Sequence, residues 1–126
     1  MNAVEITNIN EVEPYRGPHA IPGIRFRSVG EALGVTAWGM NVIELDPGAE
    51  GYPEHDHSGD GQQEVYIVLD GSLVLRTAGG DVTLTKGDMA RVAPDVTRKF
   101  VTAEAGATLL ALGGTPGKAY EPPAWS

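Results

Sequence analysis

The chain has 126 residues, a length typical of one domain that buries most of the surface its unfolded form would expose. Its 9 Lys and Arg residues against 17 Asp and Glu residues give a formal net charge of −8, which argues against binding to nucleic acid or to an anionic membrane surface. The absence of cysteine excludes disulfides and thiolate metal ligands. We therefore expect a single acidic domain spanning residues 1–126.

Short apolar segments separated by turn residues follow one another through most of the chain. In chain order the expected strands are 24–29, 35–45, 64–69, 72–77, 81–85, 89–93, 98–103 and 107–112, with one helical turn at 31–34. The segments are rich in Val, Leu and Thr and are bounded by Gly, Pro, Asp and Asn, which are typical of strands joined by tight turns. No long stretch has the 3.6-residue period of a helix. The pattern predicts an all-β sandwich or barrel.

The two ends of the chain differ in composition from its middle. Residues 13–23 and 113–126 are rich in Pro and Gly, which predicts arms on either side of a barrel core of about residues 24–112. The first ten residues, MNAVEITNIN, lack the basic and apolar segments of a signal peptide. No apolar stretch approaches the length of a transmembrane helix. These features predict a cytoplasmic protein.

Two of the three histidines, His55 and His57, stand two residues apart, shortly before the strand that begins at Glu64. In an extended strand residues i and i+2 face the same side, so both imidazoles would lie together and Glu64 would lie across from them. Two imidazole nitrogens and one carboxylate oxygen suit a divalent zinc, iron, manganese or nickel ion. Taken alone, however, the spacing is more typical of two solvated histidines beside an acidic loop.

From about Val42 to Leu112 the chain resembles the small single-domain cupins. The family's first motif has a glycine, a His-x-His pair, a glutamate and a further glycine, and it is matched by Gly48 or Gly51, His55, His57, Glu64 and Gly71. The interval from His57 to Glu64 is somewhat longer than the usual loop of the family. Parts of the second motif are matched by Gly87-Asp88, Pro94-Asp95 and Phe100.

The resemblance implies an antiparallel jelly-roll barrel with its site inside the barrel mouth. It implies a divalent metal ion at His55, His57 and Glu64, a small-molecule ligand, and a homodimer as the assembly. The family includes metal-dependent dioxygenases, isomerases and decarboxylases, so one interpretation is an enzyme acting on a small organic acid. The other is a non-catalytic cupin that binds a small molecule or serves a structural role without a metal.

The second motif departs from the family at its last metal ligand. Where the family has a histidine, the best alignment places Arg98, and a shift of one residue would place Lys99 there instead. Arginine stays protonated and has no free lone pair, so it cannot bind a metal ion. Either the three remaining ligands hold a metal while Arg98 binds a substrate carboxylate or phosphate, or Arg98 pairs with Glu64 in a barrel without metal.

Several other side chains are candidates for the cavity. Gln62, Tyr66 and Phe100 are possible substrate contacts beside Arg98, and the aromatic residues equally suit a packed core. Trp38 and Met40 are further candidates for the wall, with core packing again the simpler interpretation. His19 would supply a third imidazole only if the N-terminal arm folds over the mouth. The C-terminal arm is expected to pack on its own barrel or on a partner subunit.

Overall fold

Antiparallel strands make up most of the regular structure. The computed structural model describes residues 3–123. In chain order the elements are η1 (Ile9–Glu11, a 3-10 helix), β1 (Ile24–Arg27), α1 (Val29–Leu33), β2 (Gly39–Leu45), β3 (Gln63–Thr77), β4 (Gly80–Thr85), β5 (Met89–Val92), β6 (Arg98–Val101) and β7 (Ala107–Gly114). All pairings between these strands are antiparallel. The all-β fold expected from the sequence is therefore confirmed.

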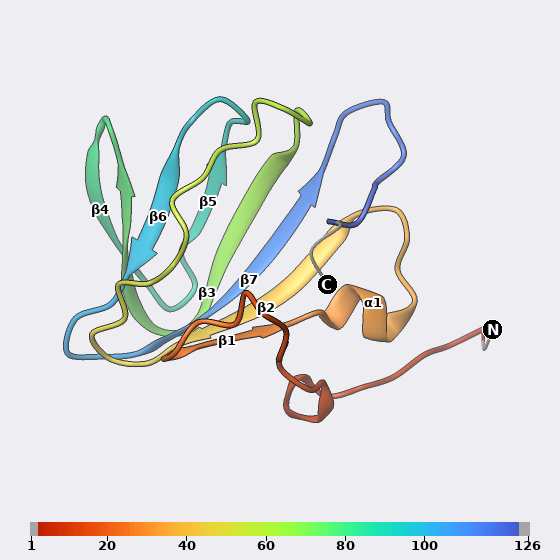
Figure 1. Cartoon of the computed structure of the whole chain (residues 1–126), viewed down its shortest axis with the longest axis horizontal. Helices are drawn as coiled ribbons and strands as arrows, with labels where there is room; N and C mark the ends of the chain where they lie inside the picture. Colours follow the sequence, from red (N-terminus) through yellow and green to blue (C-terminus); the bar gives the residue numbers. More distant parts are fainter. Residues whose placement is uncertain (1–2, 124–126) are drawn as a thin grey trace.

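The long strand β3 belongs to two layers of the molecule. Along one path the strand order is β1-β2-β7-β3-β4, while β5 and β6 also pair with β3. The first half of β3 pairs with β7 and β5, and its second half pairs with β4 and β6. Figure 1 shows β1, β2, β7 and β3 side by side in a curved layer, with β4, β5 and β6 beyond β3. This arrangement is consistent with a jelly-roll barrel.

The inward faces of the two layers form one apolar core. Buried and partly buried residues alternate along β7, as expected for a strand with one face against the interior. Tyr66 and Phe100 pack edge to face, with ring centroids 4.7 Å apart. Ile43 and Leu109 are buried beside them in the same cluster. Burying side chains of this size contributes about 1.5–3 kcal/mol each, so this core is a principal source of stability.

Several expected boundaries differ in the structure by a few residues, and three of the differences concern the arrangement of the elements. The strand expected at 35–45 begins only at Gly39, and Trp38 before it is exposed rather than part of a cavity wall. The helical turn expected at 31–34 is α1, which begins at Val29. The strands expected at 64–69 and 72–77 form one continuous strand, β3, with a bulge between Val68 and Asp70. No helix within residues 3–123 is long and apolar enough to cross a membrane.

Gly71 explains why the chain bends at this point without ending the strand. Its φ is 73°, a left-handed conformation that glycine adopts readily. A Cβ at this position would lie 2.0 Å from the backbone oxygen of Gly106, which cannot move without disturbing β7. The sequence Asp70-Gly71 therefore marks a bend that carries β3 from one layer to the other, and the turn expected there is wrong.

We expect Gly71→Ala to lower the free energy of unfolding by roughly 2–4 kcal/mol, because it adds both backbone strain and a clash with backbone. Gly79→Ala is the matched control, since its Cβ would meet only Thr77 Oγ1 at 3.6 Å. Urea denaturation of the two variants measures the difference. Equal stability of the two variants would contradict this account of the bend.

Candidate metal centre

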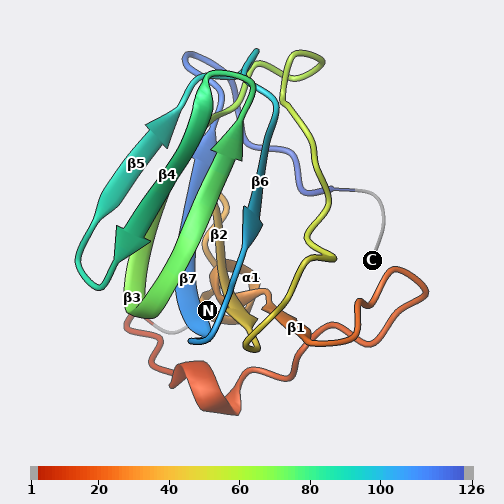
Figure 2. The ribbon, with the colours of Figure 1, turned by 90° about the vertical axis from the view of Figure 1, so that its left-hand side faces the viewer.

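The segment that joins β2 to β3 brings both histidines to the edge of β6. His55 pairs with Arg98 through two backbone hydrogen bonds, of 3.1 Å and 2.9 Å between N and O, and the N–H of His57 donates to the carbonyl of Pro94 at 2.8 Å. The expected strand at the histidines is wrong, because His55 forms only an isolated bridge. In Figure 2 this yellow-green segment runs beside β6. The bridge nonetheless gives His55 the extended local geometry that directs its side chain inward.

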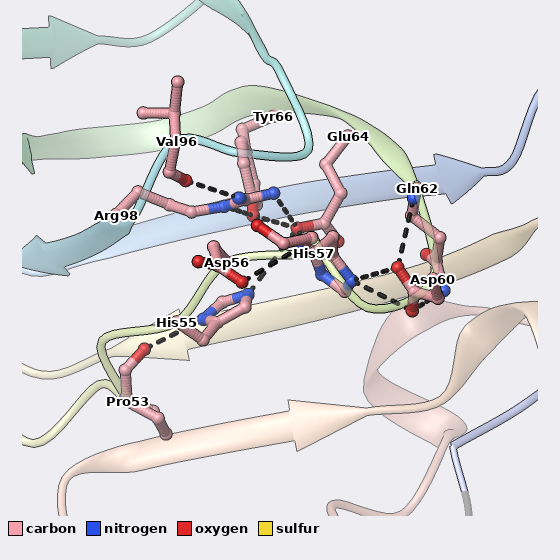
Figure 3. A network of polar contacts seen from close by, with 11 residues as sticks. Pro53, His55, Asp56, His57, Asp60, Gln62, Glu64, Tyr66, Val96 and Arg98 are labelled. Atoms are coloured by element: carbon pink, nitrogen blue, oxygen red, sulfur yellow. Dashed lines mark hydrogen bonds and ion pairs between the residues drawn. The ribbon is translucent and has the colours of Figure 1, made fainter.

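Glu64 lies near the start of β3 and meets both imidazoles. His57 Nε2 is 3.0 Å from Glu64 Oε1, and His55 Nε2 is 3.6 Å from the same oxygen. One potential ligand atom from each of the three residues lies within 4.8 Å of the other two. Figure 3 shows the three side chains pointing toward one another from the loop and from β3. Residues of the loop and of β3 thus form a compact group of two nitrogens and one carboxylate.

Hydrogen bonds on the far side of each ring fix which nitrogen faces Glu64. His55 Nδ1 lies 2.9 Å from the carbonyl oxygen of Pro53, which only accepts, so Nδ1 carries the hydrogen. His57 Nδ1 lies 3.1 Å and 3.2 Å from the two carboxylate oxygens of Asp60, which also only accept, so this Nδ1 carries the hydrogen as well. In the neutral imidazoles both Nε2 lone pairs therefore point to the Glu64 carboxylate. Histidines that bind metals are oriented in this way by outer carboxylates and carbonyls.

Arg98 faces the interior and contacts Glu64 on the side away from the cavity. Its side chain is fully buried, and Nη2 donates to Glu64 Oε1 at 2.7 Å. Its remaining donors reach the carbonyl of Val96 at 2.7 Å and the Tyr66 hydroxyl at 3.2 Å. Lys99 points the other way and donates to the carbonyl of Glu50. The structure therefore selects Arg98, and not Lys99, as the cation at this position, and it contains the pair with Glu64 that the second of the two alternatives predicts.

The surrounding groups keep Glu64 ionised. Burial raises the pKa of its carboxyl, but a hydrogen bond from the protonated form of His55, a hydrogen bond from Tyr66 and the electrostatic attraction of His57 and Arg98 outweigh burial and bring the pKa to about 2. The hydrogen bond to Glu64, opposed by burial, raises the pKa of His55. Burial, followed by the charges of Tyr52 and Glu64, raises the pKa of Tyr66 well above its ordinary value. Tyr66 therefore stays a neutral donor, and its hydroxyl donates to Glu64 Oε1.

The group opens onto a cavity of about 1070 Å³. Its walls include inward residues of β1 and β2 and parts of both terminal arms, including His19. His19 is exposed and does not belong to the cluster of potential ligands found within residues 3–123. Gln62 lines the cavity, as expected for a substrate contact. The C-terminal arm packs on its own barrel here, because Tyr120 lies against Gly39.

Three expected substrate contacts lie behind the cavity wall. Arg98, Tyr66 and Phe100 are completely buried, and the residues that line the cavity do not include them. Phe100 packs edge to face against Tyr52, which does line the cavity and stands beside the His55 ring. The geometry therefore gives Arg98 and Tyr66 contact with Glu64 in place of direct contact with a ligand.

Sequence reasoning missed two residues that shape the site. Asp60 binds His57 Nδ1 and also accepts from the backbone N–H of Gln62 at 3.0 Å, so it fixes both the ring and the turn. Its position three residues after His57, in a Gly-rich turn, is a signal that the spacing argument left unused. Tyr52 carried no such signal, because a lone aromatic residue in a loop does not reveal which ring it will contact.

Comparisons with known proteins agree with this fold. The family model described as Cupin domain matches residues 41–112, more than half of the chain. No curated protein matches the chain. Among solved structures, a sugar phosphate isomerase of the cupin superfamily from Silicibacter pomeroyi is 28% identical, with a TM-score of 0.71 over 86% of this chain and 75% of its own.

Two further solved structures share the fold at lower identity. A cupin protein from Bacteroides fragilis is 17% identical, with a TM-score of 0.71 over 99% of this chain and 95% of its own. A predicted oxalate decarboxylase from Thermotoga maritima is 22% identical, with a TM-score of 0.68 over 86% of this chain and 96% of its own. At these identities the likeness concerns the fold alone.

We expect Arg98→Met, assayed in chelator, to lower the free energy of unfolding by about 3–5 kcal/mol, because it leaves the Glu64 carboxylate buried without its partner. In the double variant with Glu64→Gln the loss should be smaller than the sum of the two single losses by at least about 1 kcal/mol. Arg25→Met is the control, since the Arg25 pair with Glu44 is partly exposed and should contribute below about 1 kcal/mol. Additive losses at Arg98 and Glu64 would show that the pair does not couple.

Proposed function

The chain belongs to the cupin family, and within that family we propose that it binds a divalent transition-metal ion through His55, His57 and Glu64. A small anionic metabolite then binds beside the ion, in the cavity of about 1070 Å³. Metal-dependent isomerisation, decarboxylation or oxygenation of a small organic acid is the enzymatic form of this proposal. The observation that best supports this proposal is that the Nε2 lone pairs of His55 and His57 both face the Glu64 carboxylate.

Neutral imidazoles whose Nδ1 atoms carry the hydrogens present only lone pairs at Nε2. Here both Nε2 atoms face a carboxylate oxygen, at 3.0 Å and 3.6 Å, and three acceptors repel one another at these distances. A cation placed among them removes the repulsion, and it is either a proton on an imidazole or a metal ion. Ligands bound to one ion at about 2.0–2.2 Å lie about 3–3.5 Å apart, which agrees with the observed spacing.

The remaining contacts of Glu64 are compatible with an ion. Arg98 and Tyr66 both donate to Oε1, and a carboxylate has about four acceptor positions, so those of Oε2 remain for a metal. Arg98 cannot be a ligand, and three protein ligands leave positions open to the cavity. A divalent ion with open positions supplies Lewis acidity to a bound carboxylate or carbonyl oxygen. The protein residues contribute the fixed tautomers of His55 and His57 and the exclusion of water behind Glu64.

Charge favours an anionic ligand once the ion is bound. Glu64 and Arg98 cancel one another, so a divalent ion adds positive charge that the three ligands do not neutralise. A carboxylate or phosphate on the cavity side supplies the missing negative charge. The similarity to the Silicibacter pomeroyi isomerase supports this ligand class, because a sugar phosphate is itself an anion.

A second candidate function rests on the ion pair between Arg98 and Glu64. The guanidinium already compensates the carboxylate at 2.7 Å, so the barrel is electrostatically complete without a metal. In that case a proton on the imidazoles replaces the ion, and the cavity serves as a non-catalytic binding site for a small molecule. Metal binding in solution separates the two functions.

We expect untagged, chelator-stripped protein to bind Zn²⁺ or Mn²⁺ with one ion per chain in isothermal titration calorimetry. His57→Ala should weaken binding by more than about 100-fold, and Asp60→Asn by about 10–100-fold through loss of ring orientation. His19→Ala is the matched histidine control and should bind as the wild type does. A thermal melt that ignores every metal and the chelator would defeat the metal proposal in favour of the second function.

We also expect Arg98→His to tighten metal binding, since position 98 pairs with His55 across the bridge and faces the same group. A histidine side chain there adds an imidazole donor and removes a repelling charge. Titration of this variant beside the wild type, with the same metals, measures the change. Weaker binding than in the wild type would show that position 98 does not project to the ion.

A further inference from the structure

The cavity has a polar end and an apolar end. The register of the sheet places Glu64, Gly113 and Gly39 on one row across β3, β7 and β2. Four residues further along β2, Ile43 lies opposite Phe26 on β1. At about 3.3 Å per residue, these two rows lie roughly 13 Å apart. A ligand bound at the metal end therefore has room to extend along the sheet toward β1.

The wall at the far end carries no charge. Ile24 and Phe26 point inward from β1, and Ile43 points inward from β2, and all three line the cavity. Ile21 from the N-terminal arm lines it beside them. The residue between the two ends on β2 is Asn41, whose amide is neutral. A hydroxyl group placed against Ile24, Phe26 and Ile43 would lose its hydrogen bonds to water without gaining others from these side chains, whereas methylene or aromatic groups would be stabilised there.

The wall is part of a fixed structure. The N–H of Tyr15 donates to the carbonyl of Phe26 at 2.7 Å, which ties the N-terminal arm to β1 at the cavity. Arg27 Nη1 donates to the carbonyl of Val12, also at 2.7 Å. On the opposite side, a Cβ at Gly39 would lie 2.9 Å from the Tyr120 hydroxyl, so this glycine permits the C-terminal arm to lie on the sheet. The N-terminal arm therefore encloses the apolar end, whereas the C-terminal arm lies at the metal end, in the row of Glu64 and Gly39.

Without a metal the charged residues of the cavity do not favour an anion. Asp60, Glu64 and Glu121 line it with negative charge, against the positive charge of Lys118 and of the buried Arg98 behind the wall. An anionic group thus depends on the ion at His55, His57 and Glu64 for its attraction. The polar end selects an anion in the presence of metal, and the apolar end selects the body of the molecule.

We propose that the ligand of this site is an amphipathic carboxylate, with its carboxylate at the His55, His57 and Glu64 end and an alkyl or aryl body against Ile24, Phe26 and Ile43. This inference rests on the proposed function, because the metal attracts the head group. It separates this chain from its relative that is a sugar phosphate isomerase. A sugar phosphate satisfies the polar end but presents hydroxyls to Ile24, Phe26 and Ile43, whose side chains offer them no partners.

The test is a homologous series of carboxylates on the Zn²⁺-loaded full chain. Acetate, butanoate, hexanoate and octanoate are titrated by calorimetry, with glucose 6-phosphate as the polyhydroxylated anion. We expect the affinity to rise by up to about fourfold for each added methylene until the apolar wall is covered. Glucose 6-phosphate should bind more weakly than hexanoate.

Variants locate the effect on the wall. Phe26→Ser should reduce the gain per methylene at least twofold while leaving the affinities for acetate and Zn²⁺ unchanged. Ile24→Thr is a second variant that removes less volume than Phe26→Ser, in case the loss of Phe26 disturbs folding. Val82→Thr is the matched control, because Val82 is exposed on β4 and does not line the cavity.

Each result either supports the inference or overturns it. If Zn²⁺ binds but the carboxylate affinity does not rise with chain length, the amphipathic ligand is overturned and the proposed function stands. A gain that Val82→Thr reduces as much as Ile24→Thr does overturns it as well, since binding would then be nonspecific. Hexanoate affinity that is undiminished in chelator overturns the role of the ion in holding the carboxylate. Absence of Zn²⁺ binding overturns the proposed function itself.

Discussion

The carboxylate of Glu64 is the group on which the rest of the structure depends. Two imidazoles, a tyrosine hydroxyl and a guanidinium all approach its Oε1 atom. A buried carboxylate is costly unless such partners compensate it, and here the partners come from different parts of the fold. The histidines belong to the loop before β3, and Arg98 belongs to β6. Satisfying one charge therefore also fixes how the loop, β3 and β6 lie against one another.

The strand alternation was predictable, but the continuity of β3 was not. Alternation of buried residues in β7 follows directly from its apolar sequence, and its expected strand is present. Asp70-Gly71 is typical both of a hairpin turn and of a bend within a strand, since both use a glycine with positive φ. What distinguishes them is the carbonyl of Gly106, which approaches where a side chain would be. That contact arises only in the folded sheet.

The site shows the same division between local pattern and tertiary contact. The spacing of His55, His57 and Glu64 was enough, together with the resemblance to cupins, to predict that they meet, because the motif fixes the residues and a short extended segment directs two of them together. Strand parity was enough to place Phe100 on the same side as Arg98. Strand parity did not reveal that Arg98 and Phe100 would both be buried behind the cavity wall. Their burial depends on loop residues such as Tyr52, which packs on Phe100 and separates it from the cavity. The enclosure of the cavity by the arms also has no periodic signal.

The replacement of a family ligand by Arg98 has a consequence for how metal binding and anion binding would depend on one another. In cupins that carry a histidine there, a neutral donor adds affinity for the ion, whereas the Arg98 guanidinium cancels the charge of Glu64 and repels a divalent cation. An anion bound on the cavity side of the ion would offset this repulsion between Arg98 and the divalent cation. Linkage then requires that metal and anion raise the affinity of one another by the same factor. A carboxylate ligand would thus complete the site electrostatically, as the missing histidine would complete it by coordination.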